Sequence, residues 1–213
     1  ISEAKNELIS ELEYPQYTRT SWQKTAAEIY LDYQRKLSSS NALDFDDLLS
    51  KAVLLFKRFP EILGKYQNKY HFILIDEYQD TNHAQYTLTK MLAARYRNLT
   101  VVGDASQSIY SWRGANFRNL VNLKNDFSDL TTINLEQNYR STQTILDVAH
   151  NVIEKNTSHP ILKLWTENQK GEKIYLFQAV NEIEEADFIA KTIQRASNYG
   201  DFAVLYRTNA QSR

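Results

Sequence analysis

The chain has 213 residues, 42% of them hydrophobic and 12% aromatic, and its 25 basic and 26 acidic side chains leave a formal net charge of −1. This composition is that of a folded globular protein and excludes the disordered and fibrous classes. The absence of cysteine excludes disulfides and thiol catalysis, and no apolar run approaches the roughly 20 residues that span a bilayer. We therefore expect no membrane association and a cytoplasmic location.

The first 68 residues have the spacing of amphipathic helices. Apolar side chains recur every three or four positions from Ala26 to Leu37 and again from Phe45 to Phe56. The polar stretch Ser38–Asn41 separates these two runs, and Pro60 is expected to stop the second.

Three aspartates stand near the start of the second run. Phe45, Leu48 and Leu49 are spaced to form one apolar face of a helix. Acidic side chains are favoured in the first turn of a helix, where the backbone carries a partial positive charge. A structural role is therefore expected for Asp44, Asp46 and Asp47.

The pattern changes at Tyr70 to short apolar runs that alternate with helical patterns over residues 83–97 and 142–154. This alternation predicts an α/β protein with a mostly parallel sheet covered by helices. A second lobe is expected to begin near Asn134, with Ser141 as a helix cap. The predicted strands are Phe72–Ile75, Leu99–Val102, Leu130–Leu135, Ile174–Phe177 and Phe202–Leu205.

The first predicted strand ends in two adjacent carboxylates, Asp76 and Glu77. The carboxyl ends of parallel strands line the ligand crevice of an α/β sheet. One carboxylate there can hold Mg²⁺ that bridges nucleotide phosphates, and its neighbour can accept a proton from an attacking water. Taken alone, the pair favours a solvated turn with a capping acid; the next two strand ends favour the functional interpretation.

The second strand runs into a polar and aromatic loop. Gln107 follows the strand end closely enough to sense a phosphate, and Tyr110 and Trp112 stand beside Arg113, a combination that suits stacking on unpaired bases. The alternative makes Trp112 a core anchor and Arg113 a surface charge.

The third strand end carries Tyr139 and Arg140. Functionally, Tyr139 would stack on a base and Arg140 would neutralise developing phosphate charge. The alternative makes Ser141 a helix cap and Arg140 an ordinary surface residue.

In this order, the segments DEYQDT (76–81), GDASQSIYSWRGA (103–115) and LEQNYRST (135–142) resemble superfamily-one DNA helicases of the UvrD, Rep and PcrA type. The resemblance extends along essentially the whole chain. It implies part of a P-loop helicase motor with RecA-like parallel sheets and an N-terminal helical segment. The implied divisions are the end of an inserted helical subdomain (1–42), the later half of the first motor lobe (43–133) and the start of the second (134–213).

The resemblance also implies a nucleotide site for ATP and Mg²⁺. Asp76 would hold Mg²⁺ and Glu77 would activate the hydrolytic water. Gln107 would contact the γ-phosphate and couple it to DNA. Tyr139 would stack on adenine, and Arg140 would reach the γ-phosphate from the second lobe.

Single-stranded DNA and duplex junctions are the implied macromolecular partners, together with repair or replication proteins. The implied activity is ATP hydrolysis coupled to 3′ to 5′ movement and duplex unwinding in DNA repair or replication. The residues implied to contact DNA are Tyr110, Trp112 and Arg113, with Arg207 and Asn209 in a segment near the end of the chain.

The chain departs from the family pattern in several places. No phosphate-binding GxxxxGK[ST] spacing occurs, and the motifs that follow in the second lobe are missing, so a central fragment without activity of its own is expected. Ser106 stands where an acid is expected and Ser111 where a basic residue is expected. The alternatives are a non-catalytic module that binds single-stranded nucleic acid, and part of a recombination helicase-nuclease.

Overall fold

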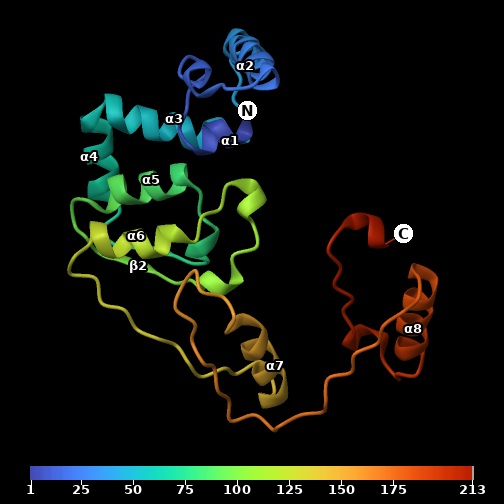
Figure 1. Ribbon diagram of the computed structural model, residues 1–213. Helices are drawn as coiled ribbons and strands as arrows, with labels where there is room; N and C mark the ends of the chain where they lie inside the picture. The colour runs from blue at the N-terminus through green and yellow to red at the C-terminus, as the bar shows by residue number, and fades with distance from the viewer. Residues whose placement is uncertain (213) are drawn as a thin grey trace. The chain divides into compact units, whose positions relative to one another are not determined.

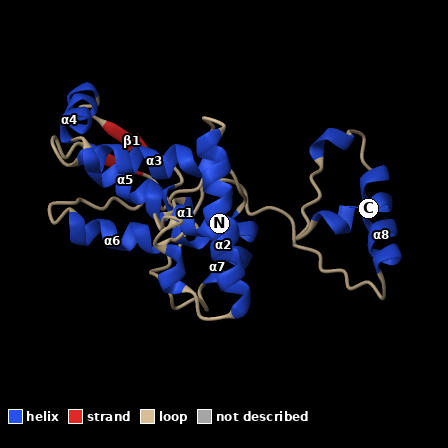
Figure 2. Cartoon of the chain, turned by 90° about the horizontal axis from the view of Figure 1, so that it is seen from above, coloured by secondary structure: helices blue, strands red, loops and turns tan. Residues whose placement is uncertain are grey.

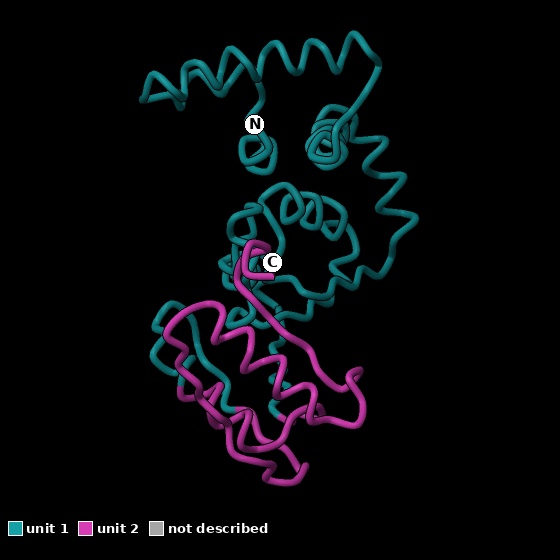
Figure 3. The backbone as a smooth tube through the Cα atoms, turned by 90° about the vertical axis from the view of Figure 1, so that its right-hand side faces the viewer, with its two compact units in different colours: residues 1–136, 152–163 teal, residues 137–151, 164–213 magenta. Residues whose placement is uncertain are grey.

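The computed structural model describes residues 1–212 and divides into two compact units (Figure 1, Figure 3). Unit 1 comprises residues 1–136 and 152–163, and unit 2 comprises residues 137–151 and 164–213. The helices of unit 1 are α1 (Ser2–Asn6), α2 (Ser21–Ser39), α3 (Phe45–Arg58), α4 (Pro60–Lys69), α5 (His83–Ala93) and α6 (Arg118–Asp126). The remaining helices are α7 (Gln143–Ile153), which lies mostly in unit 2, and α8 (Glu182–Gln194).

Three helices of unit 1 begin with the same reciprocal cap. The side chains of Thr20, Asp44 and Asn82 each accept a hydrogen bond from the backbone N–H three residues later, and that residue's side chain bonds back. Such caps satisfy backbone donors that have no partner within the helix. The structural role expected for Asp44 is confirmed. Pro60 does more than stop a helix, because it occupies the first turn of α4, where its missing N–H is not needed.

The sheet of unit 1 has two parallel strands, β1 (Ile73–Ile75) and β2 (Leu99–Val101), with Ile73 opposite Leu99 (Figure 2). Tyr78, Tyr86 and Leu123 form a buried cluster against one face of this sheet. Helices α5 and α6 therefore cover that face, and α3 packs across α5 on the side away from α6 (Figure 1).

Three of the predicted strands are wrong. Residues 130–135, 174–177 and 202–205 have no strand structure, although each has the apolar composition of one. A strand requires a neighbour that accepts its backbone hydrogen bonds, and within residues 1–212 the only pairing outside the sheet is an isolated bridge between Gln137 and Trp165. The helix that we expected Ser141 to cap begins at Gln143, so Thr142 and not Ser141 directly precedes it.

The helix face predicted at the start of α3 is apolar but exposed. The apolar face of Phe45 and Leu48 is not in the core: Phe45 is 90% exposed, whereas Asp47 is buried. In unit 2, α8 has an acidic first turn that contains Glu182 and Glu184 and is capped by Asn181. No helix among the described residues is both long and apolar enough for a membrane span.

Candidate nucleotide and nucleic-acid site

The carboxyl ends of β1 and β2 lie side by side. The Val102 N–H donates to the carbonyl of Ile75 at 2.8 Å, and the Tyr78 N–H donates to the carbonyl of Val102 at 2.9 Å. These bonds continue the parallel ladder past the strands. They bring Asp76 and Glu77 next to the loop that follows β2, as the sequence predicts for the two strand ends.

Asp76 and Glu77 are both exposed at this edge. The Glu77 N–H donates to Oδ1 of Asp76 at 2.9 Å, and the Glu77 backbone is left-handed, with φ of 51° and ψ of 42°. Oδ2 of Asp76 makes no hydrogen bond to any described residue, so one carboxylate oxygen can take a ligand. An exposed carboxylate beside a second one suits a hydrated divalent cation.

The buried side chain of Gln79 joins this carboxylate edge to the end of β2. Its Nε2 donates to Oε2 of Glu77 at 2.7 Å, and its Oε1 accepts from the backbone N–H of Asp104 at 3.0 Å. Gln79 is only 1% exposed. The position of Glu77 is therefore tied to the loop after β2 by one amide group, which the sequence reading did not single out.

Gly103 makes room for that amide. A Cβ at position 103 would lie 2.7 Å from Oε1 of Gln79 and 3.2 Å from the backbone nitrogen of Tyr78. Contacts this short force a shift of the neighbouring atoms. A glycine is needed at this position because of the close approach, and its place directly after a strand is the signal in the sequence.

Gln107 lies at the end of the short helix η3 (Ala105–Gln107). Its Nε2 donates to Oδ2 of Asp104 at 2.9 Å, while Oδ1 of Asp104 caps the turn by accepting from the Ser106 N–H. Gln107 is exposed. Its amide is thus held at the loop that Gln79 also contacts.

Tyr110, Trp112 and Arg113 form the stacking loop, which we define as Tyr110–Gly114. The rings of Tyr110 and Trp112 have centroids 6.3 Å apart, and the guanidinium of Arg113 lies 5.5 Å from the centroid of the Trp112 ring. Trp112 is 71% exposed. An exposed aromatic pair with an adjacent cation suits stacking on bases and contact with a phosphate backbone, and it excludes the alternative of Trp112 as a core anchor.

The stacking loop forms one wall of a cavity of about 570 Å³. Asn6, Phe45 and Asp46 also line this cavity. The exposed ring of Phe45 therefore adds a third aromatic surface to this cavity, and its contribution was missed because helical spacing assigned Phe45 to an apolar face.

Tyr139 and Arg140 occupy an exposed turn in unit 2. Oδ1 of Asn138 accepts from the backbone N–H groups of Arg140 at 3.0 Å and Ser141 at 2.8 Å. The Tyr139 hydroxyl donates to Oε1 of Gln137 at 2.9 Å. The turn is fixed through its backbone, which leaves the guanidinium of Arg140 available to an anion.

A second segment of unit 2 supports the same turn. Nδ2 of Asn168 donates to the carbonyls of Tyr139 and Ser141 at 3.3 and 3.1 Å. Gly171 has a φ of +80°, and a Cβ there would lie 2.4 Å from Oγ1 of Thr142. Asn168 and Gly171 were not predicted, because their contacts cross about 30 residues of sequence with no helix or strand pattern.

Arg207 and Asn209, the two further predicted DNA residues, lie near the end of unit 2. Backbone N–H groups of Arg207 and Thr208 both donate to Oε1 of Gln211 at 2.9 Å, and Asn209 begins the short helix η6 (Asn209–Ser212). Both predicted residues are exposed. Among the described residues, no hydrogen bond or ion pair joins them to Tyr139 or Arg140.

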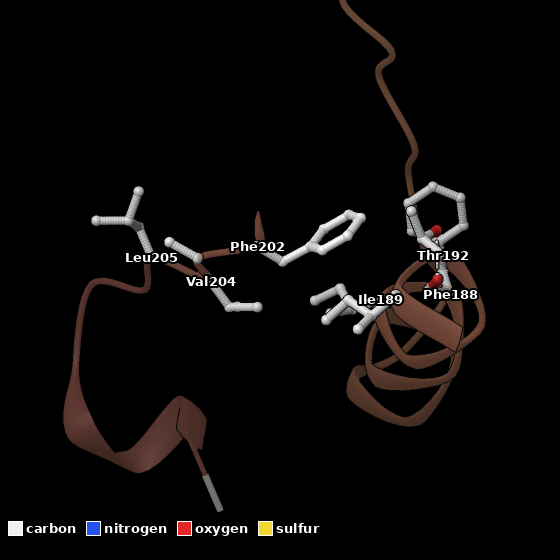
Figure 4. A pocket seen from close by; sticks show the side chains of 8 residues that line it. Phe188, Ile189, Thr192, Phe202, Val204 and Leu205 are labelled. Atoms are coloured by element: carbon white, nitrogen blue, oxygen red, sulfur yellow. Dashed lines mark hydrogen bonds between the residues drawn. The ribbon is translucent and has the colours of Figure 1, made fainter. Parts of the chain in front are cut away.

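Unit 2 also contains an apolar cavity of about 270 Å³ between α8 and residues 202–205 (Figure 4). Phe188 and Ile189 line it from the helix, and Phe202 and Val204 from the extended segment. No charged side chain lines this cavity, so it has none of the features of a phosphate site.

The residues around Asp76 fit a cation that is bound chiefly by phosphate and water. Across residues 1–212 there is no group of three or more histidine, aspartate or glutamate side chains able to hold a metal. Mg²⁺ in nucleotide sites commonly uses one or two carboxylates together with phosphate oxygens and water. The single carboxylate of Asp76 with its neighbour Glu77 matches that donor set.

Comparison with known proteins connects both units to one family. Residues 1–128 match the model of the UvrD/REP helicase N-terminal domain, and residues 133–213 match that of the UvrD-like helicase C-terminal domain.

Individual relatives agree with these matches. The ATP-dependent DNA helicase PcrA of Leuconostoc citreum is 49% identical over 218 residues, covering 100% of this chain and 29% of that protein. PcrA of Staphylococcus aureus is 48% identical over 217 residues, covering 100% of this chain and 30% of that protein. The chain thus spans about 30% of the length of these relatives.

Proposed function

The chain belongs to the UvrD/Rep family of helicases, and from that membership we propose that the protein carrying it hydrolyses ATP to drive 3′ to 5′ movement along single-stranded DNA and duplex unwinding. The observation that carries the proposal is the Gln79 side chain, which contacts Glu77 and the start of the loop leading to the stacking aromatics. One unit thereby combines a carboxylate edge suited to nucleotide chemistry with a surface suited to bases.

In the nucleotide site, Asp76 would bind Mg²⁺ through its available carboxylate oxygen. Mg²⁺, when bound, neutralises charge on the phosphates. Glu77 would accept the proton of the attacking water through Oε1, since Gln79 occupies Oε2. Gln107 would exchange its hydrogen bond to Asp104 for one to the γ-phosphate.

Two residues of unit 2 would complete nucleotide recognition. Tyr139 presents an exposed ring for the adenine base, and Arg140 presents a planar guanidinium suited to phosphate oxygens. An arginine that stabilises the transferring phosphoryl group adds about 10³- to 10⁵-fold to turnover in related chemistry. We expect this contribution to depend on the turn that Asn138 and Asn168 hold through hydrogen bonds.

On the DNA side, Tyr110 and Trp112 would stack on bases, with Arg113 beside the backbone. Arg207 and Asn209 would contribute further contacts from unit 2. Because stacking tolerates any base, this surface suits movement along DNA of any sequence. The same family membership supports a cytoplasmic role in DNA repair or replication, at duplex junctions and alongside proteins of those pathways.

The test is steady-state ATP hydrolysis by the full-length protein with and without oligo-dT. We expect DNA-stimulated turnover that Glu77→Gln lowers by at least about 100-fold with nucleotide binding retained, because a general base contributes about 10² to 10⁴. Glu172→Gln, at an exposed loop position, is the matched control. Wild-type turnover in Glu77→Gln would contradict the role of Glu77.

Polarity needs a second measurement. Unwinding of partial duplexes with a 3′ or a 5′ single-stranded tail should succeed only with the 3′ tail, and preference for the 5′ tail would overturn the proposed direction. Tight binding of oligo-dT without any ATP turnover would instead favour the non-catalytic binding module.

A further inference from the structure

Helix α1 carries a buried lysine that the nucleotide and DNA sites do not use. The Lys5 side chain is 2% exposed, and its Nζ lies 2.7 Å from Oδ2 of Asp44 and 3.0 Å from Oδ2 of Asp47. A buried ammonium persists only when it is paired and hydrogen-bonded. The two aspartates belong to the cap and first turn of α3, so Lys5 ties α1 to α3.

Helix α2 joins the same group of charges. Nε2 of Gln34 lies 3.2 Å from both carboxylate oxygens of Asp47, and the Tyr33 hydroxyl donates to Oδ2 of Asp44 at 2.9 Å. We call Lys5, Tyr33, Gln34, Asp44 and Asp47 the Lys5 cluster. Helices α1, α2 and α3 meet at this cluster. Its contacts hold α1 in place although that helix has only five residues.

The next residue, Asn6, faces the functional site instead. Its Oδ1 accepts from Nδ2 of Asn82 at 2.8 Å, and its Nδ2 lies 3.5 Å from the carbonyl oxygen of Arg113. Both asparagines are 7% exposed. Asn6 therefore connects the cap of α5, six residues after Asp76, with the end of the stacking loop.

The backbone of the stacking loop turns directly over this pair. Gly114 has a φ of +84°, and a Cβ there would lie 3.5 Å from Cβ of Asn6 and 3.7 Å from Cβ of Asn82. Just beyond, the Asn116 N–H donates to the carbonyl of Thr81 at 3.0 Å. The loop thus contacts residues 81–82 and Asn6, and the rings of Tyr110 and Trp112 remain exposed.

We propose that Asn6 is a positioning residue for the stacking loop: it holds the loop against the segment that follows Asp76 and Glu77, and the Lys5 cluster holds Asn6 in place. The position of the stacking loop then depends on the junction between α1 and α3 as well as on the segment that follows Asp76 and Glu77. This inference rests on the proposed function, in which Tyr110 and Trp112 bind single-stranded DNA.

Two substitutions break the connection from opposite ends. Asn6→Ala removes both amide contacts. Asn82→Asp keeps the oxygen that caps α5 but removes the amide donor to Asn6. If the Asn6 amide flipped to donate to the new carboxylate, its oxygen would face the Arg113 carbonyl and the contact with the loop would be lost. Asn125→Ala, at an exposed position of α6, is the matched control.

Hydrogen exchange of the full-length protein tests the positioning without DNA or nucleotide. The amides of Arg113 and Gly114 donate hydrogen bonds within the stacking loop, and the amide of Asn116 donates to Thr81. We expect both variants to speed their exchange by at least about fivefold, with amides of β1 and β2 unchanged, because local opening is independent of global unfolding. Exchange equal to wild type at these amides in either variant would overturn the proposal.

Oligo-dT-stimulated ATP turnover tests the consequence. The oligo-dT concentration for half-maximal stimulation should rise at least about tenfold in both variants, while DNA-free turnover and the KM for ATP stay within about twofold, because a small displacement of a stacking ring weakens binding to DNA alone. If DNA-free turnover and thermal stability both fell in these variants, Asn6 would have only a structural role, which would contradict the proposal. Faster loop exchange in a protein that oligo-dT does not stimulate would support the positioning role and contradict the proposed function.

Discussion

The Gln79 amide nitrogen donates a 2.7 Å hydrogen bond to Oε2 of Glu77, while its amide oxygen accepts from the Asp104 N–H. A primary amide presents donor and acceptor in a fixed relation, so these two bonds set the distance between the carboxylate and the end of β2. We therefore expect movement of the loop that carries Gln107 to shift Glu77.

Replacing Gln79 should separate chemistry from nucleotide binding. We expect Gln79→Ala to lower ATP turnover by about 10- to 100-fold with the affinity for ATP nearly unchanged, since misplacement of a catalytic group by about 1 Å has this effect. Steady-state kinetics and equilibrium nucleotide binding measure the two quantities. Gln194→Ala, at the exposed end of α8, should behave as wild type. Normal turnover in Gln79→Ala would disprove the transmission through this amide.

Gly103→Ala should act on the same contact from the other side. The new methyl group would lie 2.7 Å from Oε1 of Gln79, and overpacking of this kind costs about 1 to 3 kcal/mol of unfolding free energy. The double variant with Gln79→Ala should lose less stability than the sum of the two single variants, because the clash disappears with the side chain. Chemical denaturation of the four proteins provides the cycle, and strict additivity would argue against the clash.

Trp112 should carry a measurable part of DNA affinity. We expect Trp112→Ala to weaken binding of oligo-dT by about 1 to 3 kcal/mol, the usual value of one base stacked on an aromatic ring. Trp22→Ala removes a tryptophan of similar exposure from α2 and serves as the control. Fluorescence anisotropy of labelled oligo-dT measures both, and equal affinities of Trp112→Ala and wild type would remove Trp112 from the DNA surface.

Asn138 should affect turnover through Arg140. Asn138→Ala removes the acceptor of the Arg140 and Ser141 N–H groups, whereas Asn138→Asp retains an oxygen in the same place. We expect a loss of at least about tenfold in ATP turnover for the alanine variant, a fraction of the about 10³-fold effect of removing such an arginine. The aspartate variant should remain close to wild type in the same assay. Similar losses in both variants would show that the turn does not depend on this acceptor.

The Lys5–Asp44 contact predicts a defined pH dependence of stability. For Asp44, burial alone would raise the carboxyl pKa, but hydrogen bonds from Lys5, the Asp47 N–H and Tyr33 outweigh it and the pKa lies below its ordinary value. For Lys5, burial alone would lower the pKa, but hydrogen bonds to Asp44 and Asp47 and their charges raise the pKa above its ordinary value. The ion pair therefore contributes its full stability at pH values above the unfolded pKa of the aspartate and below the unfolded pKa of the lysine.

The variant Asp44→Asn tests this dependence, because asparagine also caps helices well and only the charge is lost. We expect it to lower the free energy of unfolding by about 1.5 to 3 kcal/mol near pH 7, as for hydrogen bonds to charged groups. The difference from wild type should shrink as the pH falls below about 3.9 and again as it rises above about 10.4, the unfolded values of the two groups. Urea unfolding at a series of pH values measures it. A difference independent of pH would contradict the assignment.

Local sequence patterns predicted the parts of the fold that depend on near neighbours. Ile73–Ile75 and Leu99–Val101 are apolar runs that end in polar residues, and both form strands. Residues 174–177 have the same composition, but a strand also needs a partner, which composition does not specify.

The candidate site likewise contains residues that a local sequence pattern predicts and residues that it does not. Asp76 and Glu77 could be found because they follow a strand directly. Asn6 could not, because its partner Asn82 is 76 residues away and neither residue belongs to a periodic pattern. Polar contacts between distant segments depend on tertiary packing, so their residues carry no local signal in the chain.

The left-handed backbone of Glu77 sets the proposed catalytic role of this residue against its conformational preference. Residues with a Cβ lose about 1 to 2 kcal/mol in this conformation, whereas glycine adopts it freely. Glu77→Gly and Glu77→Ala both lose the carboxylate and its contact with Gln79, yet the glycine variant should be the more stable by about 1 kcal/mol, the reverse of the usual order of these two residues. Thermal unfolding of the pair would show how much stability the protein gives up by having a glutamate at this position, where the backbone N–H contacts Asp76 and the carboxylate contacts Gln79.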